Sequence, residues 1–158
     1  MINLQNLSTF YIQGLREAPT ITKLIVPLLR EAGINNDDIN STEEEFNVQT
    51  SFGAVAIDIC IKIKGRPWIF LQAKPIGKAY LFRVDYKKTF EAAFKQRIPY
   101  VIFTDGNSWE FYKKTLQSGL DPQYNLLWRI DLVHKPQKTL EITHFLQGLL
   151  AEGEIANG

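Results

Sequence analysis

Two apolar stretches joined by a short turn constrain the fold of this chain more than any other feature. Residues 54–63 carry aliphatic side chains at every second position (Val55, Ile57, Ile59, Ile61 and Ile63). Residues 68–74 form a second, mostly apolar segment that favours a strand, and the Gly65-Arg66-Pro67 sequence between the two is a turn signal. Alternation with a period of two is typical of a strand that buries one face. The two stretches therefore predict an antiparallel hairpin.

Three polar side chains interrupt this hairpin, and the predicted register brings them together. Asp58 alternates with the aliphatic residues of the first strand, while Gln72 and Lys74 share one face of the second. If the turn sets the register, Asp58 lies opposite Gln72 or Lys74, and the Cβ atoms of directly opposed residues are about 5 Å apart. Either these are isolated polar residues at the end of a sheet, or the hairpin holds them together as a site.

The remaining segments predict an α/β protein with a mixed central sheet flanked by helices. Helices are expected near residues 7–17, 20–32, 82–96 and 140–153, and further strands near 45–50, 99–104, 109–114 and 125–132. Pro27 predicts a kink in the second helix, and Gly33 predicts its end. One domain spanning residues 1–158 accommodates all of these elements.

The composition is that of an ordinary globular protein, with 45% hydrophobic and 22% charged residues in a chain of 158. A single cysteine, Cys60, excludes an internal disulfide and favours a reducing compartment. The N-terminal sequence lacks the basic and apolar regions of a signal peptide, and no apolar run reaches the length of a membrane span. The expected location is therefore the cytoplasm, with no membrane association.

Charge is unevenly distributed, although the net charge is only +1. Residues 31–58 contain seven acidic residues and no Lys or Arg, whereas residues 62–97 contain ten basic and two acidic residues. A basic face would attract the phosphates of a nucleic acid. Solvated helix and turn residues explain the same distribution without a ligand. The candidates for nucleic-acid contacts are Lys78, Arg83, Lys87 and Lys88.

Asp58, thirteen intervening residues and then Gln72-Ala73-Lys74 resemble the PD-(D/E)xK nuclease motif. Two more segments, EAPTITKLIVPLLREAG (17–33) and VIFTDGNSWEFY (101–112), make the sequence similar to the N-terminal nuclease domain of type I restriction enzyme R subunits. The resemblance covers about residues 17–113. It implies a restriction-endonuclease-like αβββαβ core, here with an added C-terminal strand and helix.

The same resemblance implies a stand-alone metal-dependent endodeoxyribonuclease that hydrolyses DNA phosphodiesters with Mg²⁺ or Mn²⁺. It assigns Glu17, Asp58 and Gln72 to metal binding, and Asp58, Gln72 and Lys74 to catalysis. Gln72 stands where the family usually has Glu or Asp, so a neutral amide replaces one negative ligand and predicts a weak metal site. DNA is the expected partner. A homodimer and association with other subunits of a restriction system stay open.

Gln72 also keeps a second hypothesis open, a catalytically degenerate nuclease fold that acts as a DNA-binding or protein-interaction module. A third is a structural or oligomerisation module. Other catalytic patterns do not compete, because the sequence contains no Gly-rich phosphate loop, Cys-x-x-Cys, HExxH or GxSxG motif.

Overall fold

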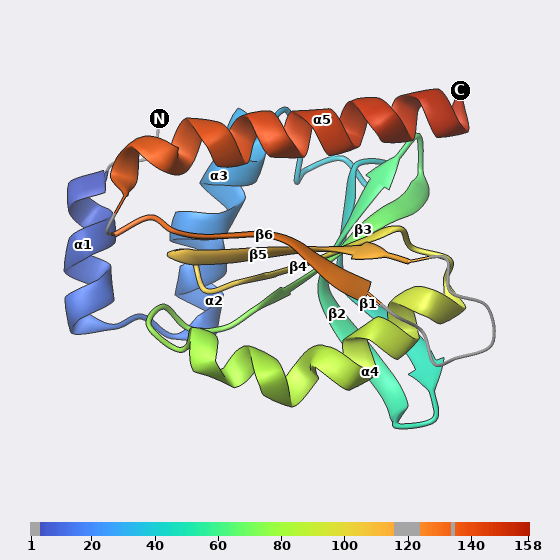
Figure 1. Cartoon of the computed structure of the whole chain (residues 1–158), viewed down its shortest axis with the longest axis horizontal. Helices are drawn as coiled ribbons and strands as arrows, with labels where there is room; N and C mark the ends of the chain where they lie inside the picture. The colour runs from blue at the N-terminus through green and yellow to red at the C-terminus, as the bar shows by residue number, and fades with distance from the viewer. Residues whose placement is uncertain (1–3, 116–123, 134) are drawn as a thin grey trace.

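The computed structural model describes residues 4–115, 124–133 and 135–158, and within them the chain builds one six-stranded sheet (Figure 1). The strands lie side by side in chain order: β1 (Thr42–Thr50), β2 (Gly53–Ile63), β3 (Arg66–Ala73), β4 (Tyr100–Thr104), β5 (Ser108–Lys114) and β6 (Tyr124–Asp131). β3 and β4 are parallel, and all other neighbours are antiparallel. The sheet is therefore mixed, as the sequence predicts.

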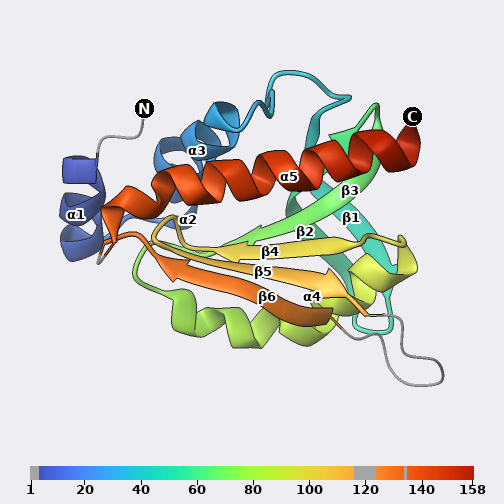
Figure 2. The ribbon, with the colours of Figure 1, turned by 45° about the horizontal axis from the view of Figure 1, so that its top comes forward.

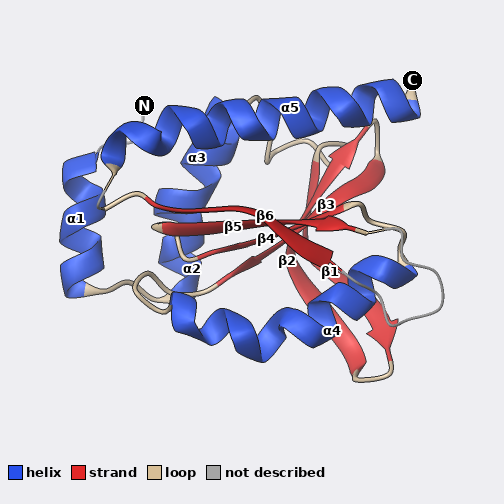
Figure 3. Cartoon of the chain, in the orientation of Figure 1, coloured by secondary structure: helices blue, strands red, loops and turns tan. Residues whose placement is uncertain are grey.

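Helices cover both faces of the sheet (Figures 1 and 3). One face carries α1 (Leu4–Gln13), α2 (Glu17–Thr20), the π-helical segment η1 (Ile21–Ile25), α3 (Val26–Glu31) and, after the 3₁₀ turn η3 (Pro136–Lys138), α5 (Thr139–Asn157). The other face carries α4 (Phe82–Lys95), which follows the 3₁₀ turn η2 (Ala79–Leu81). The chain thus has the expected αβββαβ order, continued by β5, β6 and α5. Within the described ranges, no helix is both long enough and apolar enough to cross a bilayer.

Each face of the sheet has its own apolar core. Leu71 and Ile102 pack with residues of α3 and α5, whereas the neighbouring Phe70 and Val101 pack with residues of α4. These four side chains are fully buried. β3 and β4 are therefore covered on both sides, which explains why their sequences are continuously apolar.

The helix predicted over residues 20–32 begins earlier, at Glu17, and changes its hydrogen-bonding pattern before Pro27. Pro27 has no N–H to donate, and its ring crowds the preceding turn of a regular helix. The chain forms the wider turn Ile21–Ile25 there, in which the N–H of Val26 donates to the carbonyl of Ile21. The run ends as predicted at Gly33, whose φ of +94° is readily adopted by glycine.

The turn of the predicted hairpin is shorter than the sequence suggests. Its two central residues are Lys64 and Gly65, both with positive φ (52° and 79°), the conformation of a tight two-residue turn. β3 therefore starts at Arg66, and Pro67 lies within the strand at a register shift, where a missing N–H is tolerated. β1 likewise starts at Thr42, three residues earlier than predicted.

The alternating aliphatic residues of β2 do not all share one core. Ile59 and Ile61 pack with α3 and α5, but Val55 and Ile57 belong to the core under α4. Figure 2 shows the reason: β1 and β2 turn out of the plane of the other strands and toward α4. Strand twist of this kind moves one row of side chains from one layer to another.

Candidate active site

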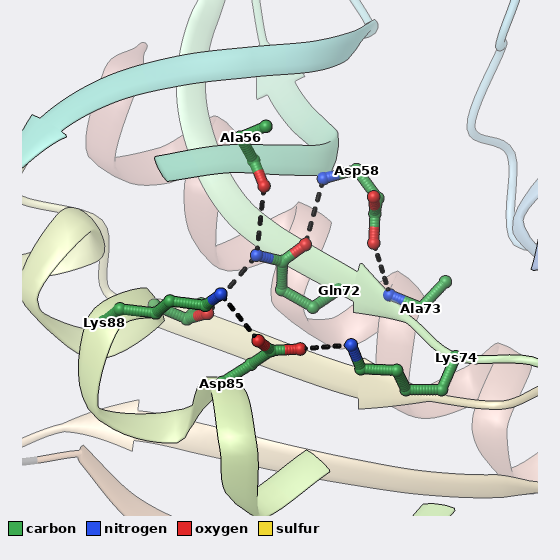
Figure 4. Close-up of polar contacts among 8 residues, drawn as sticks. Ala56, Asp58, Gln72, Ala73, Lys74, Asp85 and Lys88 are labelled. Carbon is green, nitrogen blue, oxygen red and sulfur yellow. Dashed lines mark hydrogen bonds and ion pairs between the residues drawn. The ribbon is translucent and has the colours of Figure 1, made fainter. Parts of the chain in front are cut away.

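The candidate site forms where β2 and β3 separate. Their ladder runs from Ile63 opposite Arg66 to Ile59 opposite Leu71. The side chain of Gln72 bonds to β2 beyond that point: its Oε1 accepts from the Asp58 N–H at 3.1 Å, and its Nε2 donates to the Ala56 carbonyl at 3.2 Å (Figure 4). The amide thus replaces a peptide group and continues the ladder. Its Nε2 also donates to Thr89 Oγ1 of α4 at 3.3 Å, so Gln72 ties three elements together.

Asp58 makes the reciprocal contact. Its Oδ2 accepts from the Ala73 N–H of β3 at 2.7 Å (Figure 4). Burial, together with the negative charges of Glu17 and Asp85, raises the pKa of Asp58 to about 6, although the Ala73 hydrogen bond and Lys74 oppose the shift. A carboxyl group held in this way is a good partner for a proton or a cation near neutral pH.

Lys74 is paired with an acid, Asp85, that is not among the residues predicted to form the site. Its Nζ lies 2.5 Å from Asp85 Oδ2, and Lys88 Nζ lies 2.9 Å from Asp85 Oδ1 (Figure 4). Burial pushes the pKa of Asp85 upward, but hydrogen bonds and charge from the two lysines outweigh it and hold that pKa below its usual value. The three residues together carry one net positive charge at neutral pH.

The structure brings the four predicted site residues together in one cavity of about 270 Å³. Glu17, Asp58, Gln72 and Lys74 all line it, as do Asp85 and Lys88. Glu17 is exposed at the start of α2, Asp58 and Gln72 come from the separating strands, and Lys74 follows β3 directly. The convergence of Asp58, Gln72 and Lys74 that the hairpin register predicts is therefore present, and Glu17 joins them from α2.

Of the four residues predicted to contact nucleic acid, one lines this cavity and one lines the groove beside it. Lys88 lines the cavity, and Lys87 lines the neighbouring groove. Lys78 and Arg83 are exposed, and neither lines the cavity.

The donor groups fit a magnesium ion only if it is held by few protein ligands. Within the described residues, no group of three or more His, Cys, Asp or Glu side chains has the arrangement of a metal site. The Gln72 oxygen accepts from the Asp58 N–H, so it is engaged by the backbone. Glu17 and Asp58 supply two carboxylates, and Mg²⁺ is commonly held by one or two carboxylates plus substrate phosphates and water. The cavity fits that type of site.

The sequence does not identify Asp85 as a site residue, because it appears there only as one acid in a basic segment. A signal was present, however: Asp85, Lys88 and Thr89 follow the spacing of one helix face, and α4 comes soon after Lys74. The direction in which this face points depends on how α4 packs on the sheet, which the sequence alone does not specify.

Comparison with known proteins gives structural similarity only. No protein-family model and no curated protein matches the sequence. One similar solved structure is described as a fragment of an HsdR subunit of a type I restriction enzyme from Vibrio vulnificus YJ016, with 18% identity and a TM-score of 0.47 over 84% of this chain. Another is the type IIG restriction endonuclease BpuSI, with 14% identity and a TM-score of 0.49 over 85% of this chain. This chain spans only 26% and 16% of the lengths of those two chains, respectively.

Proposed function

We propose that this protein is a metal-dependent nuclease that hydrolyses phosphodiester bonds in DNA. The observation that carries the proposal is the convergence of Glu17, Asp58 and Lys74 in one small cavity, with the pKa of Asp58 raised to about 6. Perturbed acids beside a lysine in a cavity are typical of catalytic sites.

In this proposal Glu17 and Asp58 hold the cation, Mg²⁺ or Mn²⁺, and Gln72 supports Asp58 through the strand backbone instead of ligating the ion. When bound, the ion would offset the negative charge of the phosphate and lower the pKa of a water molecule. Asp58 keeps a defined orientation because the Ala73 N–H fixes its Oδ2. Within the described part of the chain, this hydrogen bond engages Oδ2 and leaves Oδ1 for the cation.

Lys74 supplies positive charge at the phosphate. Asp85 engages its Nζ at 2.5 Å, and an ammonium group has three donors, so the remaining N–H bonds can be directed at phosphate oxygens. Asp85 acts through Lys74 and is therefore a positioning residue. Lys88 shares the same carboxylate and adds a second positive charge at the cavity.

Cleavage of plasmid and single-stranded DNA in Mg²⁺ or Mn²⁺ tests the proposal. Lys74→Ala is expected to reduce the rate about 10²- to 10³-fold, the usual effect of removing one group that stabilises developing charge. Asp58→Asn should abolish cleavage and weaken Mn²⁺ binding in a calorimetric titration. Glu44→Gln is the matched control, because Glu44 is an exposed acid of β1 outside the cavity. Equal rates in all four proteins would contradict the proposal.

The engagement of Gln72 favours one second candidate, a DNA-binding module without hydrolytic activity. Gln72 is an amide, so the site has one carboxylate fewer than the family pattern implies. The Gln72 Oε1 also accepts from the Asp58 N–H. Binding of DNA that falls with salt, without cleavage in either metal, would support this alternative.

A further inference from the structure

A groove of about 600 Å³ lies next to the candidate active site. Ser51 and Phe52 of the turn between β1 and β2 form one side, and α4 presents Lys87, Phe90, Phe94 and Lys95 on the other. Phe52 lines both this groove and the cavity that contains Asp58 and Lys74. The groove and the cavity are therefore adjoining parts of one surface.

The groove exposes aromatic surface that a folded chain would ordinarily bury. Phe52 is 54% exposed and Phe94 is 44% exposed. Phe90 also lines the groove, is half-buried and packs against the core under α4. Clustered exposed aromatic side chains of this kind mark binding surfaces in soluble proteins.

The turn that carries Phe52 is held against α4. The Ser51 N–H donates to Glu91 Oε1 at 3.3 Å, and the Ser51 hydroxyl donates to Glu91 Oε2 at 2.8 Å. Figure 1 shows this turn beside α4, on the same side of the sheet. The two hydrogen bonds fix the width of the groove and also engage both carboxylate oxygens of Glu91.

Positive charge surrounds the aromatic surface. Lys87 and Lys95 line the groove, Lys88 lines the adjoining cavity, and Lys114 Nζ lies 5.0 Å from the centre of the Phe94 ring. Aromatic faces combined with a cationic path for the backbone are the elements that bind unpaired nucleotides. An apolar peptide helix would fit less well, because lysines interrupt the apolar lining.

We propose that this groove binds an unpaired nucleobase of a DNA strand whose phosphate occupies the adjoining cavity. The base stacks on Phe52 or Phe94, and Lys87 and Lys95 contact the flanking phosphates. This inference rests on the proposed function and narrows it: the substrate is single-stranded DNA, or duplex DNA with unpaired bases at the cleavage site.

Fluorescence anisotropy with two labelled strands of equal length tests the inference, with Ca²⁺ in place of Mg²⁺ to prevent cleavage. One strand carries bases, and the other has an abasic sugar at every position, so the two differ in stacking but not in charge. Wild type should bind the base-containing strand more tightly. Phe52→Ala should weaken that binding about 5- to 150-fold and leave binding of the abasic strand unchanged, because one stacked base contributes on the order of 1–3 kcal/mol.

Two variants complete the design. Phe52→Tyr keeps the aromatic face and should retain the affinity of wild type. Leu140→Ala removes a side chain of similar exposure (65%) from α5, across the sheet from the groove, and should have no effect. A circular dichroism spectrum like that of wild type, together with cooperative unfolding, excludes misfolding of Phe52→Ala as the cause of a loss.

Three results would overturn the inference. If wild type binds both strands equally while duplex cleavage is intact, the groove does not bind bases although the proposed function stands. If wild type neither binds nor cleaves any DNA, both proposals fail. If Phe52→Ala converts a dimer into a monomer in sedimentation without changing DNA binding, the groove is an interface between two copies of the chain.

Discussion

Gln72 bonds to β2 and α4 through both ends of its amide, so its first role is to stabilise the fold. Gln72→Glu would place a carboxylate oxygen beside the Ala56 carbonyl and remove the N–H donors. We expect the free energy of unfolding to fall by about 1–3 kcal/mol, the usual cost of leaving buried polar groups unpaired. Urea denaturation measures this, with Gln49→Glu at an exposed position of β1 as the matched control. A Gln72→Glu variant as stable as wild type would show that the new carboxylate turns elsewhere.

Asp58 is expected to destabilise the protein when it is ionised. Burial, aided by repulsion from Glu17 and Asp85, raises its pKa from the usual 3.8 to about 6, so the native state holds this proton more tightly than the unfolded chain does. The free energy of unfolding should therefore fall as pH rises from about 4 to about 6 and then level off.

Asp58→Asn can keep the acceptor for the Ala73 N–H and removes the charge. It should be more stable than wild type by about 1–3 kcal/mol near neutral pH, and the difference should vanish at about pH 4. Urea denaturation at both pH values measures it. If the two proteins differ in stability by the same amount at both pH values, the charge of Asp58 is not the cause of the difference.

At the scale of elements, α5 supports the hairpin that carries the site. Gly153 faces β2 and β3, and a Cβ there would lie 2.7 Å from Ile63 Cγ1 and 2.9 Å from the Trp68 ring. Trp68 Nε1 also donates to the Leu149 carbonyl at 2.9 Å. The prediction that the closing helix ends near Gly153 is wrong, because α5 continues to Asn157. Gly153 does not end the helix; it allows the helix to pack closely on β2 and β3.

Two glycines of α5 form a matched pair of test positions. Gly153→Ala should lower the free energy of unfolding by about 1–3 kcal/mol, since overpacking exceeds the gain in helix propensity. Gly148→Ala should raise it by up to about 1 kcal/mol, because nothing lies within 4 Å of the added Cβ. Thermal unfolding of both variants measures the effects. Equal shifts of the same sign would contradict the packing at Gly153.

The elements that the sequence predicts well are those with a clear period. The aliphatic alternation of β2 specifies a strand close to its observed bounds. Aromatic residues at every fourth position (Phe82, Tyr86, Phe90 and Phe94) do the same for the helix α4. The sequence did not predict the π-helical turn before Pro27 or the division of β2 between two cores. Both features depend on how neighbouring elements pack against the segment. The pattern of residues within the segment contains little information on this packing.

At the scale of the whole molecule, the basic segment should determine how DNA affinity depends on salt. Exposed Lys78 and Arg83 flank the start of α4. If each contacts one phosphate, its replacement by Ala should reduce the slope of log affinity against log salt by about 0.7 to 0.9. Lys64→Ala is the control, because Lys64 pairs with Glu154 of α5 at the far end of the hairpin. A slope reduced equally by all three variants would indicate a response to net charge alone.

The sequence also predicts which residues meet at the site better than it predicts what they do there. Asp58, Gln72 and Lys74 converge because strand register follows from the turn and the alternation. The engagement of Gln72 by the backbone follows from the separation of β2 and β3, and the pairing of Lys74 with Asp85 follows from the placement of α4. These are tertiary features: they depend on how the elements pack, which spacing along the chain does not specify.

The hydrogen bond from Ala73 to Asp58 makes one backbone proton a reporter for the site. Ala73 is 1% exposed, and its N–H donates to Asp58 Oδ2 at 2.7 Å. The magnetic resonance frequency of that amide proton depends on the charge of the carboxylate that accepts it. A proton, a divalent ion or a phosphate arriving at Asp58 would each move this one resonance in a solution spectrum. Events at the candidate site can therefore be followed without altering any of its side chains.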